Sequence, residues 1–132
     1  MSLAGRHILL TGAARGLGAE IARALAARDA RLILADIAEE EGRAVAASLG
    51  AAFVPVDLGD PDSVAACAAA AGRETGGVLD GLVNNGAIAT GIGGIPFEEI
   101  GIESWDLVQR VNVRGTWLMT RACAPMLRAS GS

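Results

Sequence analysis

Three glycines near the start of the sequence have the spacing of a loop that cradles phosphate groups. They lie in the segment Thr11-Gly12-Ala13-Ala14-Arg15-Gly16-Leu17-Gly18, which follows the pattern G-x-x-x-G-x-G. Because 18 of the 132 residues are glycine, the bare pattern has little specificity. Its context adds weight, since a short aliphatic run that predicts a buried strand precedes it and apolar residues at helical spacing follow it.

Each glycine of this loop has its own expected purpose. Gly12 permits the tight turn, Gly16 lets the backbone approach a pyrophosphate, and Gly18 allows the following helix to pack closely. The pyrophosphate would face the unpaired N–H groups at the positive end of the helix that begins near Leu17. We therefore predict a dinucleotide site here, and the alternative is a plain turn between a strand and a helix.

Asp36 is a second candidate ligand, about twenty residues beyond the loop, at the end of another aliphatic run. A carboxylate there can accept hydrogen bonds from a ribose diol, although it could also cap a helix or lie in a solvated turn. It would repel a 2′-phosphate, which favours NAD over NADP. Arg15 has the opposite effect, because a cation beside the loop could bind that phosphate. We expect NAD, with NADP the less favoured cofactor.

Strand and helix patterns alternate along the chain, which predicts βαβ units with right-handed crossovers and a parallel sheet in the order 3-2-1-4. The fourth strand would be left at an open edge of the sheet. A glycine-rich segment without a clear period separates it from the last helix. The expected strands cover residues 7–11, 31–36, 52–56 and 81–84, and the expected helices cover 17–28, 38–49, 60–75 and 104–127.

Composition and charge exclude several classes of function. The chain is 52% apolar and 3% aromatic, which suits helices packed on a parallel sheet in one domain. A net charge of -4 argues against a nucleic-acid partner, and no apolar run approaches the ~18 residues of a membrane span. Cys67 and Cys123 lack the spacing of metal ligands, so we expect no metal, reduced thiols and a cytoplasmic location.

Together these motifs resemble the N-terminal half of a short-chain dehydrogenase/reductase. The resemblance covers essentially the whole chain, and the combination is more specific than any one motif. It implies a three-layer Rossmann-type doubly wound sheet, truncated after the fifth helix, within one NAD(P)-binding domain over residues 1–132. The features that carry it, in chain order, are the 11–18 loop, Asp36, Asp57-Leu58, Leu82-Val83-Asn84-Asn85-Gly86-Ala87 and Val111-Asn112-Val113-Arg114-Gly115.

The resemblance also implies roles for polar residues after the third and fourth strands. Asp57 would accept a hydrogen bond from the adenine amino group, unless it only caps the next helix. Asn84 and Asn85 would steady the sheet beside the cofactor ribose. The family usually has Asn-Asn-Ala-Gly here, so Gly86 places the φ-permissive residue one position earlier. The expected cofactor-binding residues are Thr11, Gly12, Arg15, Gly16, Leu17, Gly18, Asp36, Ile37, Asp57, Leu58, Asn84 and Gly86.

Asn112 is the one expected catalytic residue. A polar amide within an apolar helical stretch needs a hydrogen-bonding reason. In the family an Asn here bends the helix and holds a water that relays protons to an active-site Lys, and a merely structural amide is the alternative. The family's chemistry also needs a Ser, and a Tyr whose pKa a neighbouring Lys lowers. The sequence contains no Tyr and no Lys, so we expect no hydride transfer from this chain alone.

The resemblance implies an oxidoreductase that interconverts a secondary alcohol and a ketone with NAD(H), acts on a small alcohol or carbonyl substrate, and forms a dimer or tetramer in its full-length form. Three interpretations of the missing residues stay open. The chain is a portion of a full-length reductase, a fragment that binds nucleotide without catalysis, or a complementing half that needs a partner chain.

Overall fold

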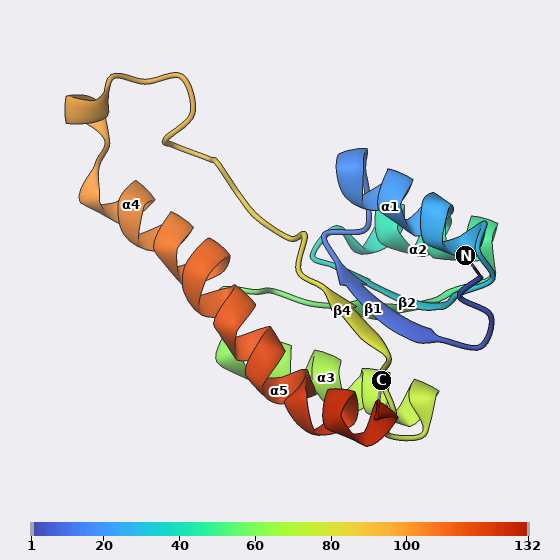
Figure 1. The fold of residues 1–132 in the computed structure, drawn as a ribbon. Coiled ribbons are helices and arrows are strands. Elements are labelled where there is room, and N and C mark those ends of the chain that lie inside the picture. Colours follow the sequence, from blue (N-terminus) through green and yellow to red (C-terminus); the bar gives the residue numbers. More distant parts are fainter. Residues whose placement is uncertain (1, 132) are drawn as a thin grey trace.

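A four-stranded parallel sheet lies between two layers of helices in the computed structural model, which describes residues 2–131 (Figure 1). The strand order is β3-β2-β1-β4, which confirms the predicted order. In the described part of the chain β4 pairs with β1 alone, so its other edge is open as expected. The strands are β1 (His7–Thr11), β2 (Arg31–Asp36), β3 (Ala52–Pro55) and β4 (Gly81–Val83).

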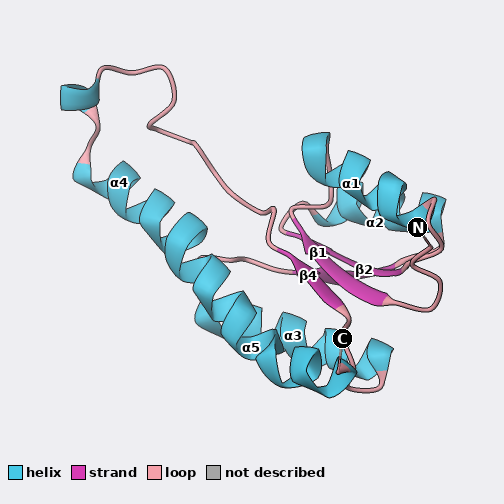
Figure 2. Ribbon diagram, viewed as in Figure 1, coloured by secondary structure: helices cyan, strands magenta, loops and turns pink. Residues whose placement is uncertain are grey.

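Helices α1 and α2 cover one face of the sheet, and α3 and α5 cover the other (Figure 1). The last helix, expected over residues 104–127, covers 102–130 and consists of three consecutive helical elements without a break (Figure 2). Its middle part is a π-helix, a more loosely wound form that is rare in proteins. The bounds are α1 (Gly16–Ala26), α2 (Glu39–Leu49), α3 (Pro61–Thr75), the short 3-10 helix η1 (Phe97–Glu99), α4 (Ile102–Val108), the π-helix η2 (Gln109–Gly115) and α5 (Thr116–Ser130).

Alternate side chains of the strands enter two separate cores, as the two-residue period of a strand requires. Ile8 and Leu10 of β1 pack beneath α1 and α2, while Leu9 packs beneath α3 and α5. Both thiols lie in the second of these cores. Burial raises the pKa of Cys67 to about 12, with a smaller contribution from Cys123, and raises the pKa of Cys123 to about 11. The two cysteines therefore behave as small apolar residues.

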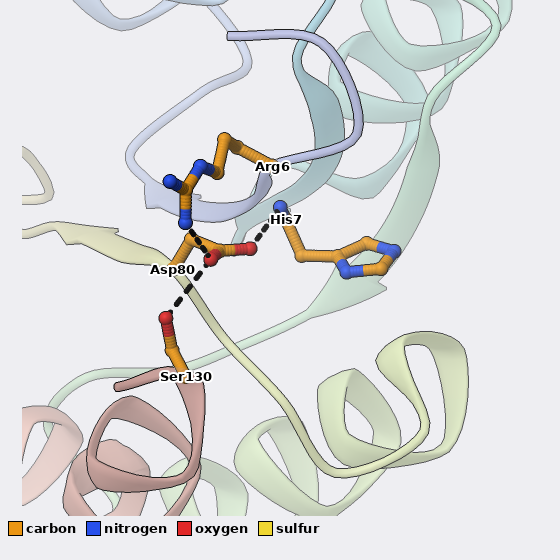
Figure 3. Close-up of polar contacts among 4 residues, drawn as sticks. All are labelled: Arg6, His7, Asp80 and Ser130. Carbon is orange, nitrogen blue, oxygen red and sulfur yellow. Dashed lines mark hydrogen bonds and ion pairs between the residues drawn. The ribbon is translucent and has the colours of Figure 1, made fainter. Parts of the chain in front are cut away.

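At the end of the sheet where β1 and β4 begin, one carboxylate joins three segments (Figure 3). Asp80 accepts hydrogen bonds from the Arg6 guanidinium at 2.8 Å, the His7 backbone N–H at 2.8 Å and the Ser130 hydroxyl at 2.9 Å. These donors, the Arg6 guanidinium first, lower the pKa of Asp80 to about 2. The carboxylate thus ties the last turn of α5 to the starts of β1 and β4.

The other end of the long helix leaves the sheet (Figure 1). Large apolar side chains are exposed there. Ile102 and Trp105 of α4, Val113 of η2 and Trp117 of α5 all expose more than half of their surface. In the described residues no helix is both long and apolar enough to cross a membrane.

Substitution of two helical glycines by alanine should have opposite effects on stability. A Cβ at Gly42 in α2 would lie 2.1 Å from the Phe53 ring of β3, so Gly42→Ala should lower the free energy of unfolding by about 1–3 kcal/mol. At Gly72 in α3 the nearest atom is the flexible Met126 thioether at 3.3 Å. Gly72→Ala should therefore leave stability unchanged or raise it by up to about 1 kcal/mol. Urea denaturation of both variants checks this, and a Gly42→Ala variant as stable as the unsubstituted protein would contradict it.

The Asp80 cluster predicts a defined loss of stability in acid. Its pKa is about 2 in the folded chain, against an ordinary value of 3.8. The stabilisation is therefore complete above the ordinary pKa and is lost as the pH falls through the folded-state value. Asp80→Asn lacks this contribution at every pH. We expect the gap in melting temperature between the two proteins to narrow between about pH 5 and about pH 2. A difference in melting temperature that stays constant over this pH range would refute the stabilising role assigned to the Asp80 carboxylate.

Candidate functional site

A cavity of about 310 Å³ opens where the carboxyl ends of the four strands meet. In a parallel sheet this edge collects the segments that follow each strand, and the strand order reverses here between β1 and β4. Most of the cofactor-binding residues expected from the sequence line it. The lining residues are Gly12, Arg15, Leu17, Gly18, Asp36, Ile37, Val56, Asp57, Leu58, Asn85, Gly86, Ala87, Ile88 and Val111.

The loop after β1 is shaped by close packing between its own glycines. Gly12 has a φ of 69°, and a Cβ at Gly18 would lie 1.8 Å from the Gly12 carbonyl oxygen. Helix α1 can therefore rest on the turn only while residue 18 is glycine. Gly16 has a φ of 54° and nothing near its Cβ position, so its glycine serves the left-handed backbone. Its expected role beside the pyrophosphate would have placed Gly16 in the lining of the cavity, but it lies outside that lining.

The start of α1 is suited to an anion. Arg15, the residue that precedes the helix, makes no capping hydrogen bond with its side chain, and the first turn contains no acidic residue. The N–H groups of that turn carry the positive end of the helix dipole. A phosphate group at this position would find donors and favourable charge without displacing a protein side chain.

A buried hydroxyl joins this loop to the one after β4. Thr11 is fully buried, and its Oγ1 accepts hydrogen bonds from the backbone N–H groups of Asn85 at 3.2 Å and Gly86 at 3.0 Å. In return the Asn85 side-chain Nδ2 donates to the Gly12 carbonyl oxygen at 3.0 Å. Thr11 lies beneath the cavity and is not one of its lining residues. It holds together the two loops that form the floor of the cavity.

Gly86 has a spatial reason for being glycine. Gly86 does not use the φ freedom that glycine brings to this position, because its φ lies outside the left-handed region. A Cβ at this position would instead lie 2.7 Å from Leu58 Cδ1 and 3.3 Å from Thr11 Oγ1. The glycine therefore leaves room for the Leu58 side chain at the wall of the cavity.

Asp36 lines the cavity, and its carboxylate also accepts hydrogen bonds from two backbone N–H groups. Its Oδ2 accepts a hydrogen bond from the Ala14 N–H of the loop after β1, and its Oδ1 accepts one from the Ala38 N–H before α2, each at 2.9 Å. The neighbouring Ile37 side chain is 67% exposed at the rim of the cavity.

Asp57 and Leu58 form the wall contributed by the segment after β3. Asp57 Oδ1 accepts a hydrogen bond from the Gly59 N–H at 2.8 Å, within its own turn. The cap of α3 is instead Asp60, which accepts from the Asp62 N–H at 3.0 Å. The alternative that Asp57 caps the helix is therefore wrong, and Asp57 is one of the residues that line the cavity.

Asn84 points away from the cavity. Its Nδ2 donates a hydrogen bond to Thr120 Oγ1 of α5 at 3.0 Å, so it ties the end of β4 to that helix. Asn85, its neighbour in the expected pair, lines the cavity in its place. Successive residues of an extended chain point to opposite sides, which explains why only one of the two can reach the site.

The Asn112 side-chain amide makes the hydrogen bonds that a polar group in an apolar helical stretch needs. From the centre of η2 its Oδ1 accepts a bond from the Ile88 N–H at 2.9 Å, and its Nδ2 donates to the Ile88 carbonyl at 2.8 Å. The amide thus fixes the segment after β4, and Ile88 rather than Asn112 lines the cavity. Gly115 brings η2 close to the same wall, since a Cβ there would lie 2.5 Å from the Leu58 carbonyl oxygen.

Besides Asn85, four lining residues lie outside the expected cofactor-binding set, and all four are apolar: Val56, Ala87, Ile88 and Val111. Such residues carry no chemical signature that separates a cavity wall from ordinary core. The available signal was position at the end of a predicted strand for Val56, and position after one for Ala87 and Ile88. Within residues 2–131 no group of three or more His, Cys, Asp or Glu side chains could hold a metal ion.

Comparison with known sequences gives consistent matches. A family model described as Enoyl-(Acyl carrier protein) reductase matches residues 12–132. A sorbitol dehydrogenase of Cereibacter sphaeroides is 38% identical over 99% of this chain and 50% of that protein. A trans-4-hydroxycyclohexanecarboxylate dehydrogenase of Sinomonas cyclohexanicum is 36% identical over 98% of this chain and 52% of that protein. The chain therefore spans about half the length of these relatives.

Solved structures match over the same extent. A 3-ketoacyl-(acyl-carrier-protein) reductase from Brucella melitensis, complexed with NADH, has a TM-score of 0.92 and 33% identity over 98% of this chain and 53% of that one. The Pseudomonas aeruginosa RhlG/NADP active-site complex has a TM-score of 0.91 and 31% identity over 99% of this chain and 51% of that one.

The contact between Gly86 and Leu58 can be tested directly. In Gly86→Ala the new methyl group would overlap Leu58 Cδ1, so either Leu58 or the loop must move. We expect a loss of about 1–3 kcal/mol of unfolding free energy. The double variant Gly86→Ala/Leu58→Ala removes the obstructing atoms, so the added methyl should cost less there than in the unsubstituted protein. Equal costs in the two backgrounds, measured by chemical denaturation, would contradict the contact.

Proposed function

This chain belongs to the short-chain dehydrogenase/reductase family, and we propose that its cavity binds NAD(H). The protein that contains it then interconverts a secondary alcohol and a ketone by hydride transfer, with a small alcohol or carbonyl compound as substrate. The observation that supports this most is the meeting of the glycine loop, the start of α1 and the Asp36 carboxylate around one cavity. Pyrophosphate and ribose need these groups side by side.

The described residues suggest how the dinucleotide is held. The N–H groups at the start of α1 would bind the pyrophosphate, and Asp36 would accept hydrogen bonds from the ribose hydroxyls. Asp57 and the Leu58 backbone would contact the adenine at the wall after β3. When bound, the nicotinamide ring supplies the hydride acceptor or donor.

The preference for NAD over NADP rests on the charge at the rim. Asp36 lies where a 2′-phosphate on the same ribose would place a second negative charge, and like charges repel. Arg15 also lines the cavity and would attract that phosphate. The carboxylate has the stronger influence in our proposal, because Asp36 is held at the site by two backbone hydrogen bonds.

Catalysis needs groups that this sequence does not contain. It has no Tyr and no Lys, and of the family's catalytic set we assign only Asn112, as the residue that positions a water in the proton relay. A second candidate function follows from the same absence. The chain alone would bind nucleotide without turnover, either as a fragment or as a half that a partner chain completes.

We also propose that the protein forms a homo-oligomer. The exposed Trp105, Val113 and Trp117 lie along one continuous helix, and large exposed apolar patches on soluble proteins mark interaction sites. A second copy of the protein would cover them.

Calorimetric titration with NADH and NADPH tests the proposed site. We expect saturable binding of NADH and at least about tenfold weaker binding of NADPH, the effect of one adverse charge contact. Gly18→Val serves as the control, because its side chain cannot fit against the Gly12 carbonyl, and it should abolish binding. Absence of saturable binding at millimolar NADH would refute both nucleotide functions. Equal affinity for the two cofactors would refute the assigned role of Asp36 in selectivity.

A further inference from the structure

We propose that Asp36 is a positioning residue for the phosphate loop in addition to its role at the ribose. The inference rests on the proposed function, since it assumes that the cavity binds a dinucleotide. It adds that the Asp36 carboxylate holds the Ala14 segment of the loop in its binding conformation, whether or not a ribose is present.

The geometry places two backbone donors on one carboxylate. Ala14 lies between Gly12 and Gly16 in the loop, and its N–H donates to Asp36 Oδ2, while the Ala38 N–H donates to Oδ1. Ala14 is only 5% exposed, so its N–H needs a protein acceptor. Hydrogen bonds to an ionised acceptor are roughly twice as strong as those between neutral groups.

The loop depends on such contacts in addition to the packing of Gly18 on Gly12, because its glycines have much conformational freedom to lose on folding. Three of its eight positions are glycine, and glycine loses more conformational freedom on folding than any other residue. Within residues 2–131, the other bonds that hold Gly12 and Ala13 to neighbouring segments join neutral groups. They run from Asn85 Nδ2 to the Gly12 carbonyl and, at 3.3 Å, from the Ala13 N–H to the Ala35 carbonyl. The Asp36 bond is the charged one and acts on the middle of the loop.

Both roles of Asp36 are compatible. An ionised carboxylate has about four acceptor positions on its two oxygens. The backbone of Ala14 and Ala38 uses one on each oxygen, which leaves acceptor capacity on each for the ribose hydroxyls. A substitution at Asp36 therefore changes two properties together, the contact with the ribose and the shape of the pyrophosphate site.

A cofactor analogue separates the two roles. We would measure the binding of NAD, and of an NAD analogue that lacks the 2′- and 3′-hydroxyls of the adenosine ribose, to the unsubstituted protein and to Asp36→Ala. If Asp36 acts only through the ribose, the substitution weakens NAD and leaves the analogue unchanged. If it also positions the loop, the analogue is weakened as well, by about tenfold or more, as expected for loss of a charged hydrogen bond.

Removing the negative charge of Asp36 should by itself strengthen pyrophosphate binding, which opposes the loss of affinity expected from the loop. This charge effect therefore needs its own control. Glu39→Gln neutralises an exposed carboxylate three residues away that contacts Arg43 rather than the loop. Its effect on pyrophosphate binding should be an increase of about twofold, because solvent and salt screen the charge. A drop in affinity for the analogue in Asp36→Ala but not in Glu39→Gln therefore supports the proposal.

Amide hydrogen exchange provides a second measurement without ligand. Asp36→Asn keeps the side-chain shape but replaces one acceptor oxygen with a donor group, so one of the two backbone bonds must be lost. We expect exchange of the Ala14 or Ala38 amide to accelerate by about tenfold or more in this variant, with both unchanged in Glu39→Gln. Unchanged exchange at both amides, or an Asp36→Ala protein that binds the analogue as tightly as the unsubstituted protein, would overturn the proposal. Failure of the unsubstituted protein to bind either ligand would instead refute the proposed function.

Discussion

The cavity depends on one buried hydroxyl. Strands β1 and β4 are neighbours in the sheet but are separated by about seventy residues in the sequence, as the spacing of Thr11 and Asn85 shows. The segments that leave them must diverge to opposite sides, because the strand order reverses at this point. Thr11 Oγ1 accepts N–H groups from both Asn85 and Gly86 and so holds the two exits together. The loop before α1 and the wall after β4 are positioned relative to each other by this contact.

The long helix makes a second connection to the same wall. Asn112 binds both backbone groups of Ile88, and Gly115 lets η2 approach Leu58 closely. At the far end of the helix Ser130 reaches Asp80 beside the starts of β1 and β4. The helix is therefore fixed at its middle and at its end, while α4 extends beyond the sheet (Figure 1).

The sequence predicted the parts of this arrangement that follow from periodicity and from glycine spacing. Alternating aliphatic runs and helical patterns were enough for the strand order and for the loop between β1 and α1, because each is determined within a short stretch of chain. Asn84 and Gly86 were interpreted incompletely, since their surroundings come from distant segments. Asn84 meets Thr120 of α5, and Gly86 meets Leu58 after β3. The π-helical winding of η2 was not predicted as such, although the resemblance implied a bend at Asn112, which is the central residue of that element.

The 1.8 Å separation between a Cβ at residue 18 and the Gly12 carbonyl has an evolutionary consequence. Every other amino acid brings a Cβ, so no series of small, individually tolerated changes leads away from glycine at that position. Substitutions around the cavity should be tolerated instead at rim side chains such as Leu17 and Ile37, which are 70% and 67% exposed. The shape of the loop would then be inherited almost unaltered among descendants, while the chemistry of the rim diverges from one lineage to the next.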